Sequence, residues 1–247
     1  MRKLLMVMAV IMAVVMVAGV ASAKLLGIEA NYEGNRPDIE YDSGGVVKYE
    51  PGSDLFTIIA WDKCYYYEPE PSPGASISNN VGFGIAIYVD ENGDFLGGVS
   101  NYTYSWDPDT KDDDITTDYD MIEYVLNDFT LTVDGEDYKF QAGDIFLAAD
   151  ILAFGWEYDG TKYKFDFLFD TVTGKLVDYG LWPTFPLTGA YVHTDPTDNV
   201  LWGTTETFQE GLAKGDKMPT PEPATLLLLG TGLIGIAQLG RKKLRKK

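Results

Sequence analysis

Apolar side chains recur at every second position through much of this chain, and residues 163–169 give the clearest case. The aromatic members of that run are Tyr163, Phe165, Phe167 and Phe169. A period of two places successive side chains on opposite faces of an extended strand, so each such run predicts a strand with one buried face. A chain dominated by this period folds into sheets and not into a helical bundle.

Short turns that contain glycine separate the strand-like runs, and Asn92-Gly93, Asp134-Gly135 and Asp159-Gly160 are typical of hairpins. The flanking runs predict three hairpins and one further strand. They are residues 82–90 with 95–106, 129–133 with 138–140, 152–158 with 163–169, and the strand 55–61. Closely spaced short strands predict an all-β fold, an antiparallel β-sandwich or a jelly-roll-like domain. We expect one helical turn, at 121–126, and a turn at 171–174 that leads into a strand at 175–179.

The first 23 residues have the three parts of a secretory signal peptide. A basic start at Arg2 and Lys3 precedes an uncharged apolar stretch from Leu4 to Val20, and the small residues Ala21 and Ala23 form the cleavage signal. We expect signal peptidase to cut after Ala23 and to remove a signal helix over residues 1–23. A retained N-terminal helix is the alternative.

A second apolar segment runs from Ala224 to Gly240 and predicts a transmembrane helix of about 25 Å, the short limit for a bilayer span. Pro221 and Pro223 stop this helix upstream. The segment is followed by a basic tail, which comprises Arg241, Lys242, Lys243, Arg245, Lys246 and Lys247. The positive-inside rule places this tail in the cytoplasm. It predicts a precursor that is anchored in the inner membrane, with residues 24–223 on the side of the membrane opposite the cytoplasm. These properties alone fit a plain C-terminal anchor equally well.

The order of features in the tail narrows this choice. Pro221, Glu222 and Pro223 precede the apolar segment and the basic end, and together residues 219–247 resemble the PEP-CTERM sorting signal. One departure is Thr220, which stands where such signals usually have a hydrophobic residue. The resemblance implies recognition by exosortase, a membrane enzyme of Gram-negative bacteria that also make extracellular polysaccharide. It makes the three motif residues a recognition site and the cell surface or extracellular matrix the destination.

The body carries a weaker resemblance. The runs 76–80, 89–98, 143–149 and 165–174 are similar to an uncharacterised all-β family that recurs among PEP-CTERM proteins. The similarity covers about residues 32–192 and implies a single domain, but it implies no activity.

Charge limits the partners of the exported part. Eight of the 19 basic residues lie in the two terminal segments, which leaves 11 against all 38 acidic residues and a net charge of −27. Such a surface repels phosphate backbones, so nucleic-acid binding is disfavoured and no nucleic-acid partner is expected. We expect one acidic all-β domain over residues 24–203. Residues 204–218 lose the alternation and predict a linker.

Candidate catalytic residues are scarce. Cys64 is the single cysteine and His193 the single histidine, so a disulfide, a zinc cluster and a histidine-based triad are all disfavoured. We expect a strand position for Cys64 and a surface position near a turn for His193. Residues 185–189 look like a sortase motif, but the apolar segment begins too far downstream. We therefore predict no catalytic residues, with paired carboxylates of a secreted carbohydrate-active enzyme as the alternative.

One acidic loop is the candidate for a metal. Five carboxylates fall within residues 107–114, namely Asp107, Asp109, Asp112, Asp113 and Asp114. Hard oxygen ligands at alternating loop positions suit calcium, although the loop does not fit the EF-hand pattern. A calcium-binding adhesion module is therefore a second alternative, against a solvated acidic turn. No other cofactor is expected.

Taken together, these features predict a non-enzymatic surface or matrix protein that associates with extracellular polysaccharide. Aromatic faces stack on sugars, and the candidates are the tryptophans, although most of these are expected in the core. They are Trp61, Trp106, Trp156, Trp182 and Trp202.

Overall fold

The computed structural model describes residues 25–26, 28, 37–42, 44–61, 64–67, 75–105, 114–183 and 188–219. The expected signal helix, the motif at 221–223, the apolar segment 224–240 and the basic tail therefore lie outside the described residues. Within those residues, no helix is long and apolar enough to span a membrane.

The described part of the chain is built almost entirely from antiparallel strands, which confirms the all-β prediction. Seventeen strands and one short helix are present in the described ranges. They are β1 Asp38–Asp42, β2 Gly45–Glu50, β3 Leu55–Ala60, β4 Cys64–Tyr67, β5 Ala75–Ser76, β6 Val81–Val89, β7 Phe95–Gly98, β8 Tyr102–Tyr104, β9 Ile115–Thr117, β10 Met121–Val125, β11 Phe129–Val133, β12 Glu136–Phe140, β13 Ile145–Ala149, β14 Ile151–Tyr158, β15 Tyr163–Phe169, α2 Lys175–Asp178, β16 Thr188–Thr194 and β17 Phe208–Pro219.

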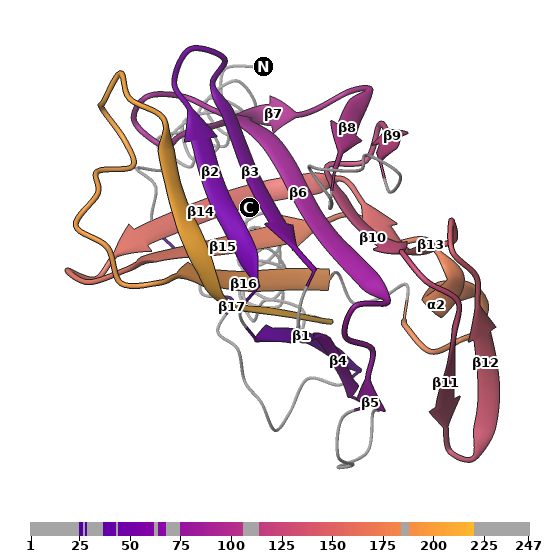
Figure 1. Cartoon of the computed structure of the whole chain (residues 1–247). Helices are drawn as coiled ribbons and strands as arrows, with labels where there is room; N and C mark the ends of the chain where they lie inside the picture. Colours follow the sequence, from indigo (N-terminus) through magenta and orange to yellow (C-terminus); the bar gives the residue numbers. More distant parts are fainter. Residues whose placement is uncertain are drawn as a thin grey trace, which may run out of the picture.

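One strand, β17, joins the two halves of a thirteen-stranded sheet. Its residues 208–211 pair with β2, and β2 continues through β3, β6 and β10 to β13. Its later residues pair with β16 on one edge and with β1 on the other. That second half includes β14 and β15 beyond β16, and β4 and β5 beyond β1. In Figure 1 the strands β2, β3 and β6 cross in front of β14, β15 and β16, so the sheet folds over on itself.

The core lies between the inner faces of the two halves. Phe56 of β3 contacts Phe165 of β15 and Phe154 of β14, with ring centroids 5.0 and 5.4 Å apart. Each fully buried aromatic side chain contributes about 1.5–3 kcal/mol through loss of exposed apolar surface. The alternation of aromatic residues in β15 thus supplies one wall of a sandwich-like core.

Most of the predicted hairpins are present. β11 pairs with β12, and β14 with β15, across the expected Asp-Gly turns. β6 pairs with β7 across the turn at 90–94, but β7 ends at Gly98, and β8 pairs with β9 instead. The chain after Gly98 was therefore wrongly assigned to the same hairpin.

Two local assignments were wrong because tertiary pairing decides short segments. Residues 121–126 were expected as a helical turn, whereas β10 occupies Met121–Val125 and pairs with β6 and β13 on its two edges. A short apolar run does not distinguish helix from buried strand. The opposite error concerns residues 175–179, which were expected as a strand and begin as the helix α2.

The linker predicted at 204–218 was also wrong. Residues 208–219 form β17, the central strand, so the folded domain continues to Pro219 and not to residue 203. Its charged residues looked solvated in the sequence. Lys214 instead forms an ion pair with Glu40 at 2.8 Å, and Lys217 is buried, with 1% of its surface exposed.

Candidate functional site

The β11–β12 hairpin presents one face toward α2, and alternation decides which residues lie on it. The cross-strand pairs of this face are Phe129 with Phe140, Leu131 with Tyr138, and Val133 with Glu136. Leu131, Val133 and Phe140 are buried. Glu136 is therefore the one charged residue on an otherwise apolar and aromatic face.

The turn of this hairpin supplies a second carboxylate. Asp134 and Gly135 have φ angles of 54° and 82°, the positive values that a tight hairpin turn requires. Asp134 and Glu136 are both exposed to solvent.

The segment after α2 forms the opposite wall. Gly180, the second residue after α2, has a φ of 74°, and this positive φ turns the chain at the end of the helix. The amide of Leu181 then donates a hydrogen bond to the carbonyl of Leu176 at 2.8 Å. This local geometry places Tyr179 at the rim and Leu181 at the base.

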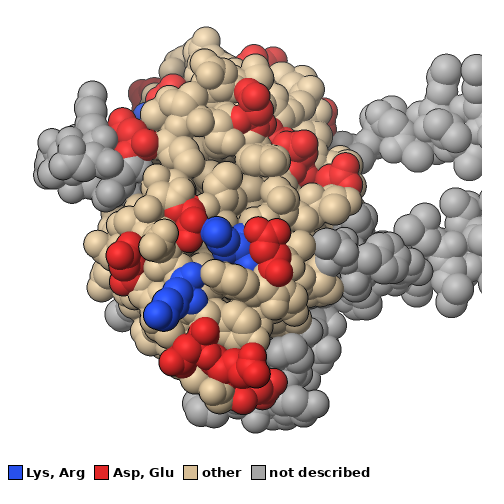
Figure 2. Space-filling view, turned by 90° about the vertical axis from the view of Figure 1, so that its right-hand side faces the viewer, with Lys and Arg blue, Asp and Glu red and all other residues tan. Residues whose placement is uncertain are grey.

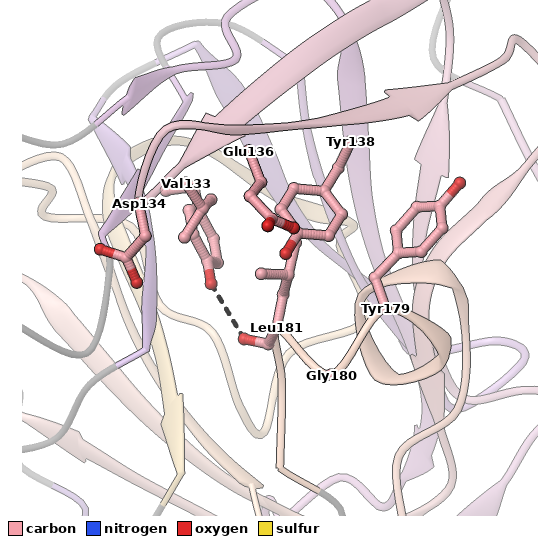
Figure 3. Close-up of a pocket in the computed structure, with 8 residues that line it drawn as sticks. Val133, Asp134, Glu136, Tyr138, Tyr179, Gly180 and Leu181 are labelled. Carbon is pink, nitrogen blue, oxygen red and sulfur yellow. Dashed lines mark hydrogen bonds between the residues drawn. The ribbon is translucent and has the colours of Figure 1, made fainter.

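Between the two walls lies a pocket of about 350 Å³ (Figure 3). It combines three tyrosines, two carboxylates and an apolar base. The lining residues are Tyr66, Val133, Asp134, Glu136, Tyr138, Tyr179, Gly180 and Leu181. The volume is within the range of about 300–1,000 Å³ that is typical of small-molecule sites.

Hydrogen bonds and ring contacts hold two of the tyrosines in place. The hydroxyl of Tyr66 donates to the carbonyl of Leu181 at 2.9 Å, the dashed line in Figure 3. The hydroxyl of Tyr179 donates to the carbonyl of Lys139 at 2.9 Å. The rings of Tyr138 and Tyr179 are 5.4 Å apart and inclined by 51°. The aromatic surface of the pocket is therefore formed before any ligand arrives.

A second polar cluster lies inside the core. Lys217 of β17 forms an ion pair with Glu123 of β10, and the hydroxyl of Tyr41 donates to the same carboxylate oxygen at 3.1 Å. The Lys217 nitrogen also lies 4.2 Å from the centre of the Phe83 ring. This cluster connects the two halves of the sheet.

Burial governs the electrostatics of this cluster. It raises the pKa of Glu123 and lowers that of Lys217, in each case against the attraction of the partner charge. Burial also raises the pKa of Tyr41 and of the nearby Cys64 thiol. Glu123 has no exposed surface and Lys217 has 1%. No ligand can reach these groups, so their role is structural.

The predicted metal loop is hardly covered by the structure. Asp107, Asp109, Asp112 and Asp113 lie outside the described residues, and Asp114 is exposed. Among the described residues, no group of three or more acidic, histidine or cysteine side chains is arranged to hold a metal ion. Calcium binding by residues 107–114 stays a prediction.

The structure also gives the positions of the single cysteine, the single histidine and four of the five tryptophans. Cys64 is buried in β4, as expected. His193 lies in β16, one residue before the strand ends; it is partly exposed, and burial lowers its pKa. Trp182 and Trp202 are buried, Trp61 and Trp156 are partly buried, and Trp106 lies outside the described residues. The exposed aromatic surface of the pocket comes from tyrosines instead.

Sequence reasoning missed the pocket because its residues are far apart in the chain. One signal was available. Glu136 falls on the apolar face of a hairpin that the alternation predicted correctly, at the exposed end of that hairpin next to the turn.

The site defines this molecule as an acidic all-β domain with a tyrosine-rich pocket, whose central strand leads into a C-terminal segment. β17 ends at Pro219, which pairs with Thr188. Residues 219–243 match the model of the PEP-CTERM protein-sorting motif. This C-terminal segment therefore carries a PEP-CTERM sorting motif, which supports an exported protein that exosortase sorts. No curated protein and no solved structure matches the chain.

Proposed function

We propose that this protein is exported, held in the inner membrane as a precursor and sorted by exosortase to the cell surface or extracellular matrix of a Gram-negative bacterium. There it has a non-enzymatic role in association with extracellular polysaccharide. The match of residues 219–243 to the sorting motif carries the proposal. The signal-peptide pattern of residues 1–23 and the basic tail support it, because they place both ends of the precursor in the cytoplasm.

The pocket supports a binding role over catalysis. Its two carboxylates, Asp134 and Glu136, are exposed. The general acid of a glycosidase works from a desolvated carboxyl group, which this pocket does not supply. Fixed tyrosine rings beside carboxylates are suited to hold a sugar in place.

The sorting step is tested by following the protein in cells with and without exosortase. We expect the cells that lack the enzyme to retain the membrane-anchored precursor. Replacing Glu222 by Ala should have the same effect in normal cells, whereas replacing the exposed Glu206 by Ala should not. Identical maturation in both strains would refute exosortase sorting.

The enzymatic alternative needs a separate test, since two carboxylates do share the pocket. Purified protein is incubated with neutral, amino and acidic polysaccharides, and newly released reducing ends are measured. We expect no release above the level of the Glu136→Gln variant. If the natural protein releases reducing ends and the Glu136→Gln variant does not, the protein is a carbohydrate-active enzyme and the proposed binding role is wrong.

The calcium alternative is tested by calorimetric titration of the protein with the ion. Heat of binding that disappears when Asp107, Asp109 and Asp112 are replaced by Asn would support the adhesion-module reading. Absence of heat at millimolar calcium would rule it out.

A further inference from the structure

We propose that the pocket between the β11–β12 hairpin and the segment that follows α2 binds a hexose unit that carries a free, protonated amino group. The inference rests on the proposed function, because it names the class of polysaccharide that the sorted protein meets. Neutral, N-acetylated and acidic sugars are the competing ligands.

Charge separates these ligands first. The exported part carries a net charge of −27, and Asp134 and Glu136 add carboxylates at the pocket itself. None of the lining residues is Lys or Arg. Figure 2 shows the side of the molecule that carries β11, β12 and α2, where acidic side chains are more widespread than basic ones. A uronic acid or a sulfated sugar would be repelled, whereas an ammonium group would be attracted.

The position of Glu136 determines which part of a bound sugar would meet a carboxylate. Glu136 and Tyr138 are two residues apart in β12, so both side chains project from the same face of the strand. In Figure 3 both point into the hollow of the pocket. A sugar ring that stacks on Tyr138 would therefore bring its substituents to the Glu136 carboxylate, which accepts hydrogen bonds and donates none. An ammonium group on the sugar would donate a charge-assisted hydrogen bond to this carboxylate.

The rings supply the remaining selectivity. The rings of Tyr138 and Tyr179 pack against each other with centroids 5.4 Å apart, and the hydroxyl of Tyr179 is already engaged by the Lys139 carbonyl. The wall at Tyr179 is therefore rigid, which reduces the entropy lost on binding. Tyrosine faces also attract cations, so an ammonium group gains from the same surface on which the sugar stacks.

The test measures binding of the full-length chain, purified in a detergent without a sugar headgroup. The probes are a glucosamine hexamer, its fully N-acetylated counterpart and a hexamer of a uronic acid. We expect the glucosamine hexamer to bind at least about tenfold more tightly than the N-acetylated one, as hydrogen bonds to charged groups indicate. The uronic acid hexamer should not bind.

Two variants assign the binding to the pocket. Glu136→Gln should weaken glucosamine binding about tenfold and reduce its preference over the N-acetylated probe. Tyr138→Ala should weaken both probes. The matched controls are Glu206→Gln and Tyr88→Ala, which change exposed residues outside the pocket. Tyr138→Phe keeps the ring and should bind normally, which separates loss of the stacking face from loss of the fold.

Several results would overturn the inference. They are equal affinity for the free-amine and N-acetylated probes, binding of the uronic acid hexamer, or unchanged binding by the Glu136→Gln variant. The experiment uses purified protein, so it is independent of sorting. Failure of the amino-sugar inference would leave exosortase processing intact, and failure of processing in cells would leave the binding result intact.

Discussion

The pocket and the buried cluster contain the same kinds of side chain and differ in access to water. The pocket combines tyrosines with Asp134 and Glu136 at the surface. The cluster combines Tyr41 and Glu123 with Lys217 inside the core. In the core, the Glu123 carboxylate is paired with the Lys217 ammonium group and accepts a hydrogen bond from the Tyr41 hydroxyl. At the surface no lysine or arginine lines the pocket, so the same chemistry is available to a ligand. Burial thus gives the groups of the cluster a structural role, whereas exposure leaves the similar groups of the pocket open to a ligand.

The largest expected loss of stability comes from breaking the buried ion pair between Glu123 and Lys217. Glu123→Gln removes the charge that offsets the Lys217 ammonium in the core, and we expect the free energy of unfolding to fall by about 3–5 kcal/mol. Denaturant titration measures this change. A loss below about 1 kcal/mol would show that water reaches the pair and that the contrast with the pocket is wrong.

Removing all the polar groups of the cluster together should be much milder. The triple variant Tyr41→Phe, Glu123→Leu and Lys217→Met leaves no buried charge and no unpaired hydroxyl, so stability should recover to within about 1–2 kcal/mol of the natural protein. The same titration decides the point. If the triple variant is as unstable as Glu123→Gln, then the cluster contributes by shape and not by charge compensation.

An intermediate effect is expected at the rim of the pocket. Tyr179→Phe deletes the hydrogen bond to the Lys139 carbonyl, and an intramolecular hydrogen bond contributes about 0.5–1.5 kcal/mol. Hydrogen exchange of the β11–β12 amides should become faster, while exchange in β17 stays the same. Tyr88→Phe is the exposed control, and an equal effect of that variant would argue against a specific role of the rim.

A half-buried group should give a smaller effect that depends on pH. Burial lowers the folded-state pKa of His193 below its ordinary value of 6.5. The unfolded chain therefore binds the proton more readily, and the contribution of this group to stability is present above pH 6.5 and is lost as the pH falls through the folded-state pKa. His193→Gln should reduce the loss of stability over that range. An unchanged pH profile would contradict the assigned burial of the ring.

The smallest effect is expected in the pocket itself. Glu136→Gln should change the free energy of unfolding by no more than about 0.5 kcal/mol, because the carboxylate is exposed. The same Glu-to-Gln substitution would then have a small effect on the free energy of unfolding in the pocket and a large one in the buried cluster. A loss as large as that of Glu123→Gln would mean that Glu136 serves the fold and not a ligand.

The sequence predicts the local hairpins well and the central strand poorly. β11–β12 and β14–β15 follow from alternation and from Asp-Gly turns, which are encoded within a few residues. β10 and β17 are defined by pairing on both edges with strands that are distant in the chain. Their charged residues Glu123 and Lys217 look solvated until the two halves of the sheet come together.

The sites show the same division. The sorting motif is linear, so its residues could be identified without the fold, and the family match confirms it. The pocket depends on residues as distant as Tyr66 and Tyr179 and on the turn at Gly180. Sequence alone indicated only that aromatic residues would be the sugar-binding candidates, and it favoured tryptophans over the tyrosines that line the pocket.

The path of β17 also has a mechanical consequence. The sorting segment continues directly from Pro219, the last residue of a strand that hydrogen-bonds to β16 and β1 along its two edges. A pull on the chain beyond Pro219 acts along the strand axis, while the ladder bonds of both edges lie across it. Such a load shears many bonds at once and does not open them one by one. A domain tethered through this end would resist detachment by force far better than one tethered through an edge strand.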